Sequence, residues 1–283
     1  MDYEECKVRG LEHLSGFIRP KDIELFDKSV DMLAAGKGSR SGCLRGLVLD
    51  CQVRALLHYF RDGDLDAMKQ WAYLSGKIRI MLLHETQELL GMEELLWPLI
   101  SDNAELLDWH CANALFYDSP RDPSKKTVVN THEFARLQMH RALSQQWEPL
   151  AEDCKRALDQ PELFKRDLQP RLAIFEFFLA LAEGDELRMR QLLLDRCTPQ
   201  QRARSHQFES GLTNDLIVSY ATIYAKLAWR AGYELNIETP WIPGDWLPVR
   251  PLASYEDPWA FMQSFDIWMP FDGEWAAWSP VRG

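Results

Sequence analysis

The chain has 283 residues, of which 46% are hydrophobic, and a formal net charge of −11 at pH 7. This length and composition supply a real hydrophobic core and predict a globular protein. No run approaches the roughly 18 apolar residues of a membrane span, and the acidic start MDYEEC leads into no apolar signal segment, so we expect a cytoplasmic protein without membrane contact.

The six cysteines are spread along the chain without a CxxC pair. Such spacing is typical of neither a disulfide framework nor a zinc ribbon. We therefore expect reduced, mostly buried thiols, and neither a metal nor a cofactor.

The negative charge is concentrated in two windows. Residues 80–120 contain eight acidic residues and no Lys or Arg, and residues 231–283 contain eight acidic residues against two Arg. Phosphate contacts need clustered Lys and Arg, so nucleic acid is not an expected partner. An acidic surface of this kind favours a basic protein partner.

The N-terminal part of the chain predicts helices joined by short turns. Residues 36–39, GKGS, have neither a preceding apolar strand nor the full GxxxxGK[ST] spacing of a phosphate-binding loop, so we interpret them as a connector. Gly63-Asp64 predicts the bend of a helical hairpin. The apolar residues recur with helical spacing over residues 18–33, 44–60 and 65–83.

The next part alternates between helices and polar breaks. Residues 85–117 are helical by composition, with breaks at Trp97-Pro98 and near residues 101–103, where a capping side chain is expected. Residues 119–130 predict a polar loop, and residues 134–158 predict another hairpin that bends near residues 145–149.

The most hydrophobic stretch is residues 172–182, which is apolar at every position except Glu176. A helix that is apolar almost all round belongs in a core, and Pro170 suits its first turn. Gly184 predicts its end and Asp185 the cap of a following helix. Glu176 is expected to make a structural hydrogen bond to Arg171 or to another helix.

The C-terminal part changes character. After an expected helix over residues 214–231, residues 233–238 alternate like an extended segment, and four prolines between 240 and 251 forbid a helix. Six of the eleven tryptophans lie in the last 43 residues. Either this irregular arm packs its rings on the helical body, or part of it forms a binding surface.

The predicted fold class is therefore all-α, with stacked antiparallel helical hairpins and an irregular Pro/Trp-rich C-terminal arm. We expect a helical domain over residues 1–238 and an acidic extension packed on it over residues 239–283.

No sequence pattern indicates catalysis. His84-Glu85 and His132-Glu133 lack the second His of HExxH, and His132 and His140 have no identified partners for a metal. Asp108, His110 and Cys111 are too close together on one helix for a nucleophile to reach its base. We therefore do not expect an enzyme.

The order LAIFEFFLALAEGDELRMRQLLL and then IYAKLAWRAGYELNIETPWIPGDWL, over about residues 168–247, resembles the C-terminal half of the immunity protein 49 family. These are all-helical proteins predicted to protect bacteria from toxins of polymorphic secretion systems. The matching residues are fold residues, so the resemblance implies no catalytic or ligand position. It implies that the protein binds a cognate toxin in the cytoplasm and blocks it.

The two acidic windows also contain large aromatic residues, which makes them candidate toxin-binding faces. Equally, the acids can serve only solubility while the aromatics lie in the core. A helical scaffold or adaptor for another basic partner is the alternative function. A third alternative is an enzyme that reverses the toxin's modification, which would require a cleft of convergent polar residues that no sequence motif indicates. The candidate residues are Glu93, Glu94, Asp102, Glu105, Asp108, Trp109 and Asp118 in the first window, and Glu256, Asp257, Trp259, Asp266, Trp268, Asp272, Glu274 and Trp275 in the second.

Overall fold

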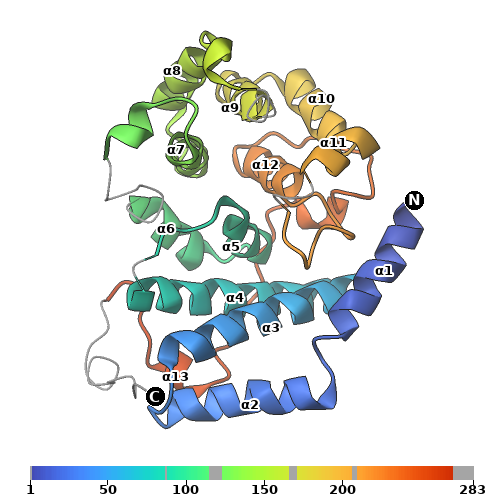
Figure 1. Cartoon of the computed structure of the whole chain (residues 1–283), viewed down its shortest axis with the longest axis vertical. Coiled ribbons are helices and arrows are strands. Elements are labelled where there is room, and N and C mark those ends of the chain that lie inside the picture. The colour runs from blue at the N-terminus through green and yellow to red at the C-terminus, as the bar shows by residue number, and fades with distance from the viewer. Residues whose placement is uncertain (1, 87, 115–122, 166–170, 206–208, 270–283) are drawn as a thin grey trace. The chain divides into compact units, whose positions relative to one another are not determined.

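The computed structural model describes residues 2–86, 88–114, 123–165, 171–205 and 209–269. Within these ranges every regular element is a helix, which confirms the all-α prediction (Figure 1). None of the described helices combines the length and the apolar character needed to cross a bilayer.

The chain divides into two compact units. Unit 1 comprises residues 1–88, 97–109 and 250–283, and unit 2 comprises residues 89–96 and 110–249. This division cuts across the expected boundary between residues 238 and 239, because residues 239–249 belong to unit 2 and the rest of the arm to unit 1.

Unit 1 is built on the predicted hairpin of α3 and α4, which are in extensive contact (Figure 1). The bend between them contains Gly63 with a φ of 69°, a conformation that glycine adopts without strain. Asp64 then accepts a hydrogen bond of 2.9 Å from the Ala67 N–H and so caps α4. The helices of this unit are α1 (Tyr3–Ser15), α2 (Pro20–Ala34), α3 (Arg40–Phe60), α4 (Leu65–Thr86), α13 (Ala260–Gln263), most of α5 (Leu96–Ser101) and α6 (Ala104–Ala112) as far as Trp109.

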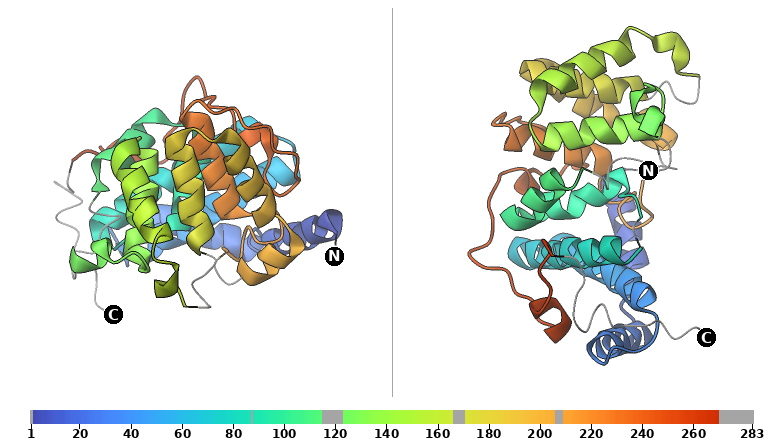
Figure 2. Two further views of the ribbon diagram at one scale, coloured as in Figure 1. Left: turned by 90° about the horizontal axis from the view of Figure 1, so that it is seen from above. Right: turned by 90° about the vertical axis from the view of Figure 1, so that its left-hand side faces the viewer.

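Residues 250–269, which we call the C-terminal segment, contact α4 from Lys69 to His84 and reach α2 through α13 (Figure 2). Gln70 on α4 exchanges two hydrogen bonds with the backbone of Glu256, at 2.8 and 3.1 Å. Tyr255 donates from its hydroxyl to the carbonyl of Ser101. This described part of the arm is therefore packed on the helices of unit 1.

Unit 2 is organised around α9, as the sequence predicts. Phe178 on α9 is fully buried, and its ring lies 5.2 Å from that of Tyr224 on α12. Gly184 ends α9 with a φ of 75°, and Asp185 caps α10 by accepting from the Arg188 N–H at 2.9 Å. The elements of unit 2 are η1 (Met92–Leu95), η3 (Pro123–Thr127), α7 (His132–Leu143), α8 (Trp147–Leu158), η4 (Pro161–Leu163), α9 (Leu172–Glu183), α10 (Glu186–Arg196), α11 (Pro199–Ser205), α12 (Ser219–Arg230) and η7 (Gly244–Trp246).

Glu176 has the structural role that its position predicts, although it is half-exposed rather than buried. Its carboxylate pairs with Arg188 on α10. Pro170, which was expected to open this helix, lies outside the described residues.

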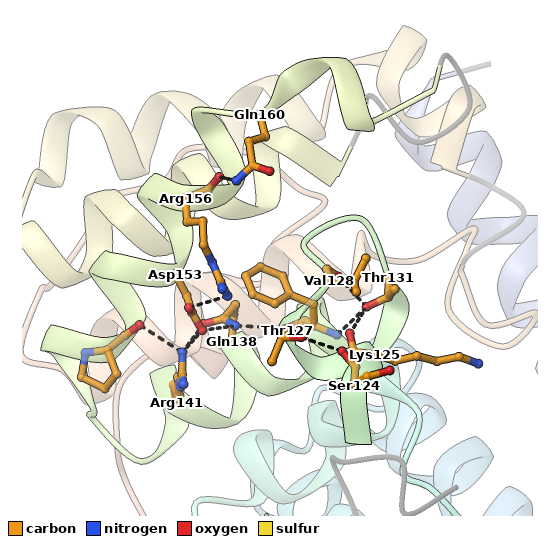
Figure 3. A network of polar contacts seen from close by, with 12 residues as sticks. Ser124, Lys125, Thr127, Val128, Thr131, Gln138, Arg141, Asp153, Arg156 and Gln160 are labelled. Atoms are coloured by element: carbon orange, nitrogen blue, oxygen red, sulfur yellow. Dashed lines mark hydrogen bonds and ion pairs between the residues drawn. The ribbon is translucent and has the colours of Figure 1, made fainter. Parts of the chain in front are cut away.

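The predicted hairpin over residues 134–158 is formed by α7 and α8, which are held together by a polar network (Figure 3). Asp153 on α8 accepts from Gln138 at 3.1 Å and from Arg156 at 2.8 Å, and it also pairs with Arg141. Arg141 donates as well to the carbonyl of Pro149, at 3.0 Å. One carboxylate thus joins both helices and their bend.

The helix expected over residues 214–231 is shorter than predicted, because α12 begins at Ser219. The Ser219 N–H donates to the Glu209 carboxylate at 3.0 Å, and the Val218 N–H donates to the carbonyl of Trp241 at 2.9 Å. These nonlocal bonds take up donors that a longer helix would have used internally. The helical spacing of apolar residues gives no indication of these bonds.

Candidate functional site

Four candidate acids are solvent-exposed in unit 1, and none of them forms an ion pair within the described chain. We call Glu105, Asp108, Glu256 and Asp266 the unpaired acids. Two come from α6 and two from the C-terminal segment, so both predicted windows contribute to one unit. Their exposure makes them available to a partner.

Acidic residues of both windows influence Tyr73 on α4. The Tyr73 hydroxyl donates to Asp257 at 2.9 Å, and Lys77 also pairs with that carboxylate, at 2.5 Å. Burial is the largest cause of the raised pKa of Tyr73, and the nearby charges of Asp257 and Glu105 raise it further. Residues from α6 and from the C-terminal segment therefore act on the same side chain, although more than 150 positions separate them in the sequence.

The aromatic candidates of the second window differ in their availability. Trp259 is half-buried, with its ring 5.6 Å from that of Phe26 and 6.4 Å from that of Trp71. Trp268 is 46% exposed and Met269 is 52% exposed. Trp259 therefore anchors the C-terminal segment, whereas Trp268 offers an aromatic surface near Asp266.

Two candidates of the first window are buried, which corrects the prediction. Asp102 is 2% exposed and pairs with Lys69 at 2.6 Å. Its carboxylate also accepts from the Arg250 N–H at 3.1 Å. Trp109 is 1% exposed, and its ring meets the edge of His84 at 5.9 Å. Both side chains stabilise the fold and do not belong to a binding surface.

Other candidates are occupied in local structure or lie outside the description. Glu93 and Glu94 belong to unit 2 and are half-buried. Glu93 accepts from the Tyr220 hydroxyl at 3.3 Å, and Glu94 accepts from the Gly91 N–H at 2.6 Å. Asp118, Asp272, Glu274 and Trp275 lie outside the described residues.

Two buried lysines, which were not predicted from the sequence, donate to backbone carbonyls between residues 246 and 250. Lys226 on α12 is fully buried and donates to the carbonyls of Trp246 and Pro248, at 2.7 and 2.9 Å. Lys69 on α4 donates to the carbonyl of Arg250. The sequence does contain a signal for Lys226, because this lysine lies within the apolar face of α12. The sequence around Lys69 contains no comparable signal.

Within the described residues, the histidines and cysteines belong to no cluster that could hold a metal ion. His132 is exposed and contacts Arg171, whereas His140 is buried and lies 3.1 Å from the carbonyl of Cys111. Burial lowers the pKa of both histidines and raises the pKa of the Cys197 thiol to about 12. A reactive thiolate would need the opposite shift.

One carboxyl of unit 1 predicts a pH-dependent stability. Burial raises the pKa of Asp50 on α3 from 3.8 to about 6, with Arg54 lowering it and Asp22 raising it. The pKa of Asp50 is higher in the folded state than in the unfolded state. The protonated carboxyl therefore contributes stability that is fully present below about pH 4 and is lost as the pH rises through about 6. Asp50→Asn should therefore stabilise the protein at pH 7.5 by about 1 to 2 kcal/mol, since a pKa unit is worth about 1.4 kcal/mol and the carboxyl is only partly buried.

The measurement is urea unfolding at several values between about pH 5 and pH 7.5. Asp27→Asn, on an exposed position of α2, is the matched control and should leave the pH profile unchanged. A variant at Asp50 whose profile has the same slope as the wild type would contradict the expectation.

Comparisons of this chain with protein-family models, with curated proteins and with solved structures find no match.

Proposed function

We propose that this protein is an immunity protein that binds a cognate antibacterial toxin domain in the cytoplasm and blocks it by occlusion. The observation that supports the proposal most is the presence of the four unpaired acids in one unit, with an exposed tryptophan beside one of them. The family resemblance of residues 168–247 suggests the role, and the charge suggests the kind of partner.

The charge of unit 1 fits a basic partner. Its sequence contains 22 acidic and 15 basic residues, a net charge of −7, against −4 for unit 2. Toxins that act on nucleic acids are expected to be basic around their working cleft, because they must contact phosphate. Opposite charges steer such partners together and raise the association rate more than the final affinity.

Simultaneous replacement of the unpaired acids by lysine should slow association with the toxin roughly 10-fold at low salt and reduce its salt dependence. The side chains are exposed and form no ion pair with other described residues, so the variant should fold normally. The measurement is stopped-flow association over a salt series, with the product of the neighbouring gene as the partner, because immunity genes are expected beside their toxins.

A second variant controls for net charge. It places lysine at four exposed acids of unit 2, namely Glu152, Asp159, Glu162 and Glu234. This variant has the same net charge as the first one. If the toxin binds a specific surface on unit 1, the second variant should slow association much less than the first. Equal slowing by both variants would show that only net charge matters, and no binding by the wild type would refute the immunity role.

The mode of protection also distinguishes the proposal from its alternatives. Occlusion requires one immunity protein for each toxin, whereas an enzyme that reverses the toxin's modification would protect at a small fraction of that ratio. A scaffold or adaptor would instead be recovered from its native cells with a different basic protein.

A further inference from the structure

A buried polar cluster in unit 2 lies where α10, α12 and the residues before α12 meet. Tyr224 is completely buried, and its hydroxyl has no hydrogen-bond partner in the described protein. The Nε of Arg196 and the Oε1 of Glu209 are likewise buried without a partner there. Buried polar groups in folded proteins are nearly always hydrogen-bonded, so three such atoms in one neighbourhood require an explanation.

The three side chains are close to one another. The guanidinium of Arg196 lies over the Tyr224 ring, 5.2 Å from its centroid. Burial raises the pKa of Glu209, and the charge of Arg196 acts on it in the opposite direction. Glu209 is fixed because its other oxygen accepts from the Ser219 N–H at 3.0 Å.

The surrounding rings offer the Tyr224 hydroxyl no conventional acceptor. Phe177 stacks on the Tyr224 ring with a centroid distance of 5.1 Å, and Phe178 meets it edge-on at 5.2 Å. Tyr220, one helical turn away, has its own acceptor in Glu93. The apolar neighbours thus fix the ring, and the hydroxyl is left without a hydrogen-bond partner among the described residues.

The chemistry of the three atoms identifies what would satisfy them. Arg196 Nε can only donate, an ionised Glu209 oxygen can only accept, and the Tyr224 hydroxyl can do both. An anion would be repelled by Glu209 and a cation by Arg196. A neutral group that both donates and accepts fits all three, and buried water typically makes about three such bonds.

We propose that Tyr224, Glu209 and Arg196 form an internal binding site for ordered water. The water bridges the hydroxyl to the carboxylate, and so links α12 to the residue that caps its first turn. All three residues belong to unit 2, whereas the unpaired acids belong to unit 1.

Tyr224→Phe tests the proposal, because it removes only the hydroxyl and keeps the ring. If water bridges that hydroxyl, the variant should unfold at a lower urea concentration than the wild type. If the hydroxyl has no hydrogen-bond partner at all, its removal relieves the cost of burying an unsatisfied polar group, and the urea midpoint should rise. Tyr220→Phe is the matched reference, because it removes a direct bond to Glu93 from the same helix.

A high-resolution crystal structure of the wild-type protein provides the second measurement. We expect an electron-density peak within hydrogen-bonding distance of Tyr224 Oη and Glu209 Oε1, and its loss in Tyr224→Phe. Absence of the peak from the wild type, or a raised midpoint in the variant, would overturn the water site. A peak that is too large for water would also overturn it, in favour of a small hydroxyl- or amide-bearing ligand.

Discussion

Replacement of Lys69 by methionine should lower the free energy of unfolding by about 3 to 5 kcal/mol, since it leaves a buried carboxylate without its cation. The Lys69 side chain is 2% exposed and that of Asp102 is 0% exposed, with 2.6 Å between their charged atoms. Methionine fills nearly the same volume, so the effect measures the lost charge and the lost hydrogen bond to the Arg250 carbonyl rather than a cavity. Urea unfolding followed by circular dichroism gives the value.

A double variant separates the pair from its parts. Lys69→Met combined with Asp102→Asn removes both charges and should regain most of the loss, because replacing a whole buried pair is often close to neutral. Asparagine tolerates the positive φ of 59° at position 102. Lys155→Met, which breaks an exposed pair with Glu183, should leave stability nearly unchanged. If Lys69→Met behaves like Lys155→Met, water reaches Asp102 and the pair is not truly buried.

The helices were predictable because their signals are local. Apolar spacing located α3, α4 and α9, and Gly184 with Asp185 marked the bend of the central hairpin correctly. A helical period depends only on which face of the helix is buried. Such a pattern is therefore visible without any knowledge of what covers that face.

Nonlocal contacts were not predictable in the same way. Asp102 looks like a surface acid in an acidic window, but its position beside Lys69 and Arg250 makes it part of the core of unit 1. The start of α12 depends on Glu209, ten residues earlier. In both cases a bond to a distant residue overrides the local propensity.

The candidate site was predicted only in part. Composition located the acidic residues of both windows, and Glu105 and Glu256 are among those that the structure exposes. It did not predict that α6 and the C-terminal segment belong to the same unit, or that Glu105 and Asp257 both act on Tyr73. That convergence arises because the C-terminal segment packs on α4, a contact with no sequence signature.

Phe178→Ala should destabilise unit 2 by about 3 to 5 kcal/mol, the usual cost of truncating a buried phenylalanine. Phe178 is completely buried on α9 and contacts the rings of Phe177 and Tyr224. Truncation removes these contacts and leaves a cavity that rigid neighbours fill only partly. A loss of this size is a large part of the stability of a typical domain. The measurement is urea unfolding, with the melting temperature as a second observable.

Leu187→Ala is the matched control, because Leu187 lies on the neighbouring helix α10 and is 79% exposed. Its truncation should change the free energy of unfolding by no more than about 0.5 kcal/mol, since it creates no cavity. Lys69 belongs to unit 1 and Phe178 to unit 2, so comparison of their variants also shows whether one cooperative transition covers both. A melting temperature for Phe178→Ala equal to that of the wild type would mean that α9 is not the core of its unit.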